Sequence, residues 1–153
     1  MKNVLFLCTG NSARSILAEC YLNHSGQDKF TAYSAGSMPT GTPNPLSIKT
    51  LEAHHIPLTT GDGEGPRSKS WDMFAEADAP KMDFVITVCD NAAGEVCPIW
   101  PTKKGGAAPQ KHHWSFPDPA AATGSEKEKL SVFETIFVDI RQHIDHFIAK
   151  ETT

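Results

Sequence analysis

The residues best suited to chemistry are a cysteine and an arginine six positions apart, Cys8 and Arg14, near the start of the chain. The loop between them consists of Thr9, Gly10, Asn11, Ser12 and Ala13. Such a loop can turn its backbone N–H groups inward as an anion-binding nest, and a helix that follows it adds partial positive charge. Arg14 can hold two oxygens of a tetrahedral oxyanion at once. The pattern therefore predicts a thiolate nucleophile held against a phosphate-like anion.

The chemistry of this pair depends on the pKa of the Cys8 thiol. An unperturbed thiol has a pKa of about 8.5 and is only a few per cent thiolate at neutral pH. A helix N-terminus and a nearby cation lower that pKa, so we expect Cys8 to react as a thiolate. The alternative is a structural role, because a buried cysteine also behaves as a small hydrophobic residue. Ser15 either hydrogen-bonds the thiolate and assists its departure or caps backbone donors of the helix.

Two secondary-structure elements must hold this loop in place. Residues 4–7, before the cysteine, are apolar and typical of a buried strand. Residues 15–22 combine helix formers with apolar side chains at positions 16, 17, 20 and 21, which predicts a helix. Cys20 lies inside that helix among apolar neighbours, and we interpret it as a core residue.

The rest of the chain alternates strands and helices. Strands are predicted over residues 30–36 and 83–89 with a short edge strand at 112–114, and helices over 45–54 and 70–75. Ser125 and Glu128 form a capping box for a last helix with an apolar face. This alternation predicts an α/β fold, with a parallel sheet flanked by helices on both faces and a site at the carboxyl ends of the strands.

A second group of candidates is a pair of cysteines eight positions apart, Cys89 and Cys97. Cys89 ends a predicted strand, as Cys8 does, so both thiols could face the same crevice. The pair could form half of a zinc site, a disulfide or two inert core thiols. Zinc would need two more ligands, and His112 and His113 are adjacent and poorly spaced to supply them. A redox role is better supported, because a thiolate that forms a covalent adduct often needs a second thiol to resolve it.

A third candidate is Asp118, which lies between Pro117 and Pro119. Flanking prolines hold such a residue in a stiff, extended loop, which suits a general acid delivered over a site. The alternative is an ordinary Asp-Pro turn. On this feature alone, the turn is the simpler interpretation.

Composition limits the possible functions. The chain of 153 residues is predicted to form one domain, 1–153, with enough bulk for a hydrophobic core. A net charge of −4 and the lack of a basic stripe argue against a nucleic-acid partner. No apolar run is long enough to span a membrane, so no membrane partner is expected. Four cysteines without an export signal favour a reducing, cytoplasmic location.

Taken together, these segments resemble the low-molecular-weight protein tyrosine phosphatase superfamily, which includes the thiol-linked arsenate reductases. The similarity covers nearly the whole chain, through residues 8–15, 33–36, 44–45, 67–71, 85–98 and 113–120. The run from Cys89 to Pro98 is similar to the reductase branch in particular. The resemblance implies a four-stranded parallel sheet with flanking helices, and it gives Asp118 the position of the general acid.

The resemblance also implies a mechanism. Cys8 attacks bound arsenate, while Arg14 and loop residues 9–13 hold the oxyanion. Cys89 then attacks the sulfur of the Cys8–arsenic adduct, which releases arsenite and leaves a Cys8–Cys89 disulfide. Cys97 moves the disulfide outward to Cys89–Cys97. Thioredoxin, or a glutaredoxin with a small thiol, would restore the dithiol.

The sequence also departs from the family pattern. Phosphatases place an aromatic pair after the Asp-Pro of the acid loop, whereas this chain has alanines at 120–122, which weakens the alternative function of a phosphotyrosine phosphatase. Seven residues separate Cys89 from Cys97, where thioredoxin-coupled members have six. A third alternative is a non-catalytic sensor that binds anions or forms the disulfide without turnover.

Potassium is the one metal ion that the resemblance raises, since some relatives bind it through side-chain oxygens. Asn11 and Ser34 match two ligands of that site, while the other ligands are not clearly matched, and residues 61–66 lengthen a nearby loop. We therefore predict no metal ion, and the mechanism requires no cofactor.

Overall fold

Four parallel strands form the sheet at the centre of the computed structural model, which describes residues 1–76, 78–88, 109–119 and 122–152. The strands are β1 (Lys2–Leu7), β2 (Phe30–Ala35), β3 (Phe84–Thr87) and β4 (Gln110–His113). Their order across the sheet is β2-β1-β3-β4, and every neighbouring pair is parallel. This confirms the predicted four-stranded parallel sheet. The predicted edge strand begins earlier than expected, at Gln110.

The strand register brings the carboxyl ends of β1, β2 and β3 to one edge of the sheet. Leu7 pairs with Ala35 on one side and with Thr87 on the other. Both faces of β1 are buried, since Val4 and Phe6 join one hydrophobic cluster and Leu5 and Leu7 join another. A strand that packs on both faces needs a continuous apolar sequence, which is why residues 4–7 do not alternate.

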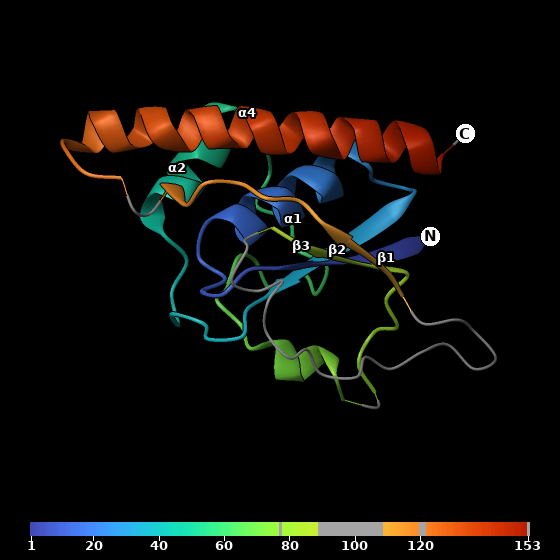
Figure 1. Ribbon diagram of the computed structural model, residues 1–153. Coiled ribbons are helices and arrows are strands. Elements are labelled where there is room, and N and C mark those ends of the chain that lie inside the picture. The colour runs from blue at the N-terminus through green and yellow to red at the C-terminus, as the bar shows by residue number, and fades with distance from the viewer. Residues whose placement is uncertain (77, 89–108, 120–121, 153) are drawn as a thin grey trace.

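Three α-helices lie on one face of the sheet (Figure 1): α1 (Arg14–Ser25), α2 (Pro45–Ala53) and α4 (Glu126–Glu151). In Figure 1, α1 and α2 lie between the sheet and the long α4. On the opposite face lies the short green helix η1 (Trp71–Phe74), a single 3-10 turn where a short helix over 70–75 was expected. Trp71 and Phe74 pack there against the second face of β1.

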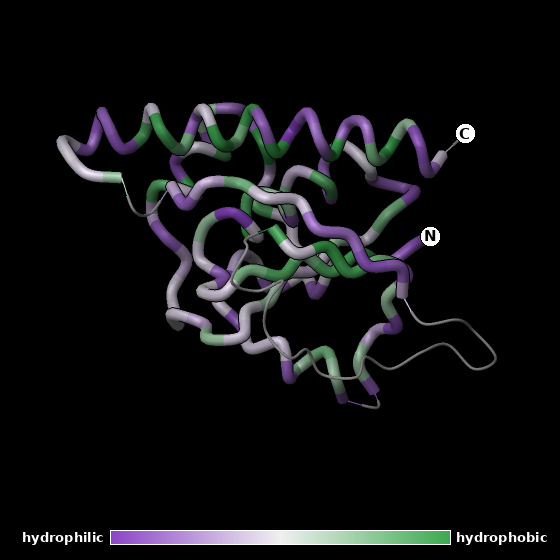
Figure 2. The backbone as a smooth tube through the Cα atoms, in the orientation of Figure 1, coloured by the Kyte–Doolittle hydropathy of each residue, from purple (hydrophilic) through white to green (hydrophobic). Residues whose placement is uncertain are grey.

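The last helix, α4, begins as its sequence predicts. The Ser125 hydroxyl accepts from the Glu128 N–H, and the Glu128 carboxylate accepts from the Ser125 N–H, so the predicted capping box is present. Apolar and polar residues alternate along the helix in Figure 2, and its apolar side faces α1 and α2. Within the described parts of the chain, no helix is long and apolar enough to cross a membrane.

Candidate active site

Cys8 lies at the carboxyl end of β1, where the strand passes into the loop that leads to α1. Only 4% of its surface is exposed, and its N–H donates to the Ala35 carbonyl of the neighbouring strand at 3.2 Å. The main chain at the nucleophile is therefore fixed by the sheet itself. This is the position expected for a site at the carboxyl end of a parallel sheet.

The carbonyl groups of the loop are turned outward by donors from residues 38–44. The carbonyl oxygens of Thr9, Gly10 and Ser12 accept from the N–H groups of Met38, Thr40 and Asn44 at 2.9, 3.0 and 2.9 Å. In a trans peptide the N–H points away from the C=O of the same plane. The N–H groups of Gly10, Asn11 and Ala13 therefore face the opposite side of the loop, as an anion-binding nest requires.

Asn11 gives the loop its sharpest bend. Its φ of +46° lies in the left-handed region, and its side chain is completely buried. The side chain donates to the Ser15 hydroxyl at 2.9 Å and accepts from the Lys69 N–H at 2.8 Å. Ser15 is thus held by Asn11, and the N-cap residue of α1 is Ala13, which makes no side-chain capping bond. Of the two roles weighed for Ser15, the capping role is absent.

Gly36 allows the chain after β2 to approach this loop closely. A Cβ atom on Gly36 would lie 2.5 Å from the Thr9 carbonyl oxygen and 2.7 Å from that of Cys8, distances that real Cβ atoms do not show. The Gly36 N–H donates to the Lys69 carbonyl at 2.8 Å, which ties residues 67–70 to the same place. The backbone of the nucleophile loop is therefore packed against a position that only glycine can fill.

Arg14 and Asp118 are brought together over the loop. The Arg14 guanidinium donates to the Phe116 carbonyl at 2.9 Å, and it lies 3.8 Å from the Asp118 carboxylate. The Arg14 side chain is 13% exposed, while that of Asp118 is 46% exposed and so reaches solvent. Arg14 Nε is buried and has no hydrogen-bond partner among the described residues. An oxyanion in the nest would satisfy that donor.

The four cysteines fall into different groups. Cys20 is completely buried in α1, and burial, with the nearby Glu19 carboxylate, raises the pKa of its thiol to about 12. It therefore remains a neutral thiol, in agreement with its predicted core role. Cys89 and Cys97 lie outside the described residues. The last described residue before them, Val88, is buried, and its N–H donates to the Leu7 carbonyl.

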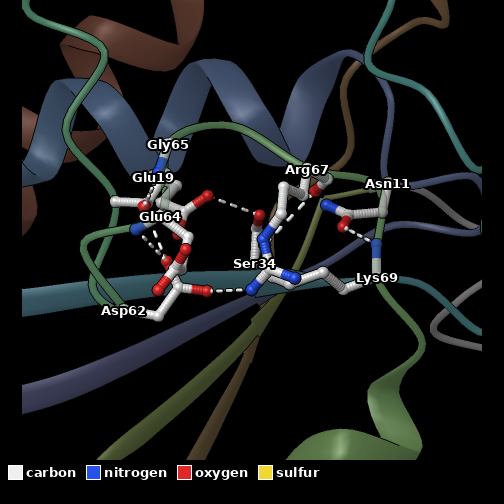
Figure 3. Close-up of polar contacts among 9 residues, drawn as sticks. Asn11, Glu19, Ser34, Asp62, Glu64, Gly65, Arg67 and Lys69 are labelled. Atoms are coloured by element: carbon white, nitrogen blue, oxygen red, sulfur yellow. Dashed lines mark hydrogen bonds and ion pairs between the residues drawn. The ribbon is translucent and has the colours of Figure 1, made fainter.

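Behind the loop lies a buried polar cluster that sequence reasoning missed (Figure 3). The Glu19 carboxylate of α1 accepts from the Ser34 hydroxyl of β2 at 2.6 Å, and both side chains are completely buried. Burial raises the pKa of Glu19 to about 7, although the Lys69 ammonium and the Ser34 hydroxyl act in the opposite direction. Lys69 itself is only 3% exposed. An acid amid the apolar residues of the predicted helix over 15–22 was the available sign of this cluster.

A second acid, Asp62, lies at the exposed edge of the cluster. Burial would raise the pKa of Asp62, but hydrogen bonds from the Glu64 N–H, the Thr60 hydroxyl and the Arg67 guanidinium outweigh it, so the pKa lies below its usual value. The contact with Arg67 is at the same time an ion pair. The charge of Asp62 is therefore matched within residues 60–67.

Two oxygen atoms matched to a potassium site take part in hydrogen bonds within the chain. The side-chain oxygen of Asn11 accepts from the Lys69 N–H, and the Ser34 hydroxyl donates to Glu19, although both oxygens keep a lone pair. The buried Lys69 ammonium also acts on both Glu19 and Asp62. A second cation beside it would meet like-charge repulsion in a region of low dielectric.

Several known proteins are similar to this chain in sequence or in structure. A model of the family described as low molecular weight phosphotyrosine protein phosphatase matches residues 3–152. The arsenate reductases of Halalkalibacterium halodurans and Bacillus subtilis are 34% and 32% identical to this chain, each over 95% of this chain and 94% of the relative. A solved arsenate reductase in the phosphate binding state has a TM-score of 0.72 at 27% identity, covering 98% of both chains. A low molecular weight phosphotyrosine phosphatase from Vibrio cholerae, at 17% identity and a TM-score of 0.68, covers 99% of this chain and 97% of its own and shares the fold.

Proposed function

Because this chain belongs to the low molecular weight phosphotyrosine protein phosphatase family, we propose that it reduces arsenate to arsenite through a covalent adduct on Cys8. The observation that carries the oxyanion chemistry is the outward orientation of three loop carbonyls, which turns the opposing N–H groups toward one site beside Cys8. The choice of arsenate over phosphate is supported by relatives at 34% and 32% identity that are named arsenate reductases.

The first step joins the Cys8 sulfur to arsenic. The Cys8 thiolate and dihydrogen arsenate form a Cys8–S–As bond, and an As–O bond breaks as the leaving hydroxyl takes up one proton and departs as water. Asp118, held near Arg14, supplies the proton to the leaving oxygen. Arg14 and the N–H groups of loop residues 9–13 hold the remaining arsenate oxygens. Ser15, whose oxygen accepts from Asn11, keeps its own proton to donate to the thiolate.

The second step reduces arsenic. Cys89 attacks the Cys8 sulfur, so a disulfide forms while the S–As bond breaks and leaves its electron pair on arsenic. Two thiols are thereby oxidised, and As(V) becomes As(III) and leaves as arsenite. Cys97 then attacks Cys89 and frees Cys8. An external dithiol, of the thioredoxin type or a glutaredoxin with a small thiol, reduces the final disulfide.

The test is the arsenite yield of the fully reduced protein. Without a reductant, we expect about one arsenite per chain, and with a thioredoxin or glutaredoxin system supplied in turn, we expect continuous turnover. Cys8→Ser and Cys89→Ser should abolish arsenite formation, and Cys97→Ser should abolish multiple turnover. Cys20→Ala is the matched control, because it removes a buried thiol that the reaction does not use.

The competing function is hydrolysis of phosphotyrosine through a Cys8 phosphoenzyme, which needs neither Cys89 nor Cys97. Hydrolysis of an aryl phosphate that survives Cys89→Ser and Cys97→Ser, with no arsenite produced by either reductant system, would overturn the proposal. Weak phosphatase activity beside efficient arsenite formation is compatible with it, because one nest binds both tetrahedral oxyanions.

A further inference from the structure

A groove with a volume of about 330 Å³ lies between the end of β4 and the last turns of α4. One wall is formed by His112 and Trp114. The other wall includes His143, Phe147 and Lys150, which are spaced four and three positions apart and therefore share one face of the helix. The volume falls at the lower end of the range of about 300–1,000 Å³ that is typical of small-molecule sites. No residue of the nucleophile loop lines this groove, so it is separate from the candidate active site.

Aromatic rings supply the apolar surface of the groove. Trp114 and Phe147 meet edge to face at 72°, with ring centroids 5.9 Å apart. Phe147 is buried and Trp114 is half-buried, so the tryptophan ring remains partly open to a ligand. The His143 ring lies 5.6 Å from Trp114. Since flat rings pack well on aromatic faces and edges, this surface favours a ligand with an aromatic ring.

The polar side chains of the groove are mainly basic, although the net charge of the whole chain is −4. Three histidines and a lysine line it, and a single carboxylate does: His112, His143, His146, Lys150 and Glu151. The Nε2 atom of His112 is buried and has no hydrogen-bond partner among the described residues. Leaving such an atom unbonded is costly. A carboxylate on the ligand would bond to it and would be attracted to the ammonium group of the lysine.

The walls of the groove also support the segment that carries Asp118. The His143 ring packs edge to face on Phe116, with centroids 4.9 Å apart, and Phe116 is 3% exposed. The Phe116 carbonyl accepts from the Arg14 guanidinium at 2.9 Å. A molecule seated against Trp114 and His143 would therefore restrain the residue that orients Arg14.

We propose that this groove binds a small aromatic carboxylate and that the bound molecule strengthens oxyanion binding in the nest. The ligand ring would pack on Trp114 and Phe147, and its carboxylate would bond to His112 Nε2 beside the Lys150 ammonium. By restraining the segment that carries Asp118, the ligand would reduce the ordering that must accompany oxyanion binding. The proposal goes beyond arsenate reduction, and it holds for whichever oxyanion the nest takes.

The test is an NMR titration of the reduced protein with 1-naphthoate as the probe, with and without saturating inorganic phosphate. We expect saturable changes in the amide signals of residues 112–114 and 142–151. Phosphate should raise the affinity for naphthoate by about threefold or more, and naphthoate should raise the affinity for phosphate by the same factor, because such coupling is reciprocal. Acetate lacks the ring and 1-naphthalenemethanol lacks the charge, so each should bind at least about tenfold more weakly.

Two variants test the polar contacts of the ligand. His112→Phe keeps a ring beside Phe84 but removes the unbonded nitrogen, and Lys150→Gln removes the ammonium. Each should weaken naphthoate binding by about fivefold or more, and each should keep the wild-type phosphate affinity when naphthoate is absent, which also shows that it folds. Lys127→Gln is the matched control, because Lys127 is likewise an exposed lysine of α4 but does not line the groove.

Three results would overturn the inference. Naphthoate binding that phosphate weakens, with signal changes at residues 9–14, would place the probe in the nest and not in the groove. Equal binding of naphthoate and its neutral alcohol, or wild-type affinity in both His112→Phe and Lys150→Gln, would show apolar contact without a carboxylate site. Naphthoate affinity that is the same with and without phosphate would refute the link to the nest, whether or not arsenate proves to be the substrate.

Discussion

Gly36→Ala tests how tightly the nucleophile loop is held. The new Cβ atom would lie 2.5 Å from the Thr9 carbonyl oxygen and 2.7 Å from the Cys8 carbonyl oxygen, so the loop or the chain after β2 must move by about 0.5 Å to reach even a short contact. Overpacking of this kind costs about 1–3 kcal/mol of unfolding free energy. Displacing reacting groups by about 1 Å can cost about a hundredfold in rate, so we expect at least a tenfold loss in kcat/KM and in phosphate affinity.

The assays are urea unfolding and calorimetric titration of the reduced protein with inorganic phosphate, followed by arsenite production. Gly26→Ala is the control, because its Cβ is also crowded, by Leu22 at 2.9 Å, but it precedes β2 at the end of the strand away from Cys8. We expect Gly26→Ala to lose stability without losing affinity. Wild-type affinity and rate in Gly36→Ala would refute the argument that the close approach of Gly36 shapes the nest.

The remaining predictions concern single side chains. Asp118→Asn should lower kcat/KM for arsenate by about a hundredfold or more in steady-state assays, if Asp118 is the proton donor, and leave phosphate affinity nearly unchanged. Arg14→Lys should raise the KM by about tenfold or more, because lysine cannot reach both Phe116 and two oxyanion oxygens. Burial raises the pKa of Glu19 to about 7 in the folded protein, so the folded state binds more protons than the unfolded state between about pH 4.5 and pH 7. The unfolding free energy of the wild type should therefore fall over that range relative to Glu19→Gln, by up to about 3 kcal/mol in urea titrations, and a constant difference would contradict the pKa. Ser125→Ala should cost about 1 kcal/mol by removing the capping box of α4 while leaving arsenite production intact.

Local patterns were sufficient to predict the elements that frame the site. The apolar run before Cys8, the proline at the start of α2 and the capping box of α4 each specify an element within a few residues, and all three elements are present. The alternation of strands and helices then placed Cys8 at the carboxyl edge of the sheet. These predictions depend on propensity and periodicity, which the sequence displays directly.

The fine structure of the site depends on contacts that a local pattern does not display. Arg14 binds the carbonyl of Phe116, 102 positions away, and that bond involves a backbone atom of no particular residue type. Asn11 and Lys69 meet across 58 positions. The buried charge of Lys69 was hidden for the same reason, since a lysine in a polar loop is usually exposed. Only the tertiary arrangement of residues 67–70 beside Gly36 buries it.

The outward hydrogen bonds of the loop carbonyls also indicate at which stage of folding the nest forms. Its donors come from residues 38–44, and Ser68 and Lys69 reach it from 58 positions away. Contacts of such long separation form after local helices, because a large loop must close first. During refolding, helical signal should therefore return before the ability to bind phosphate. Inorganic phosphate or arsenate binds only the fully formed nest. Either anion should therefore slow unfolding, because it stabilises the part of the structure that forms last.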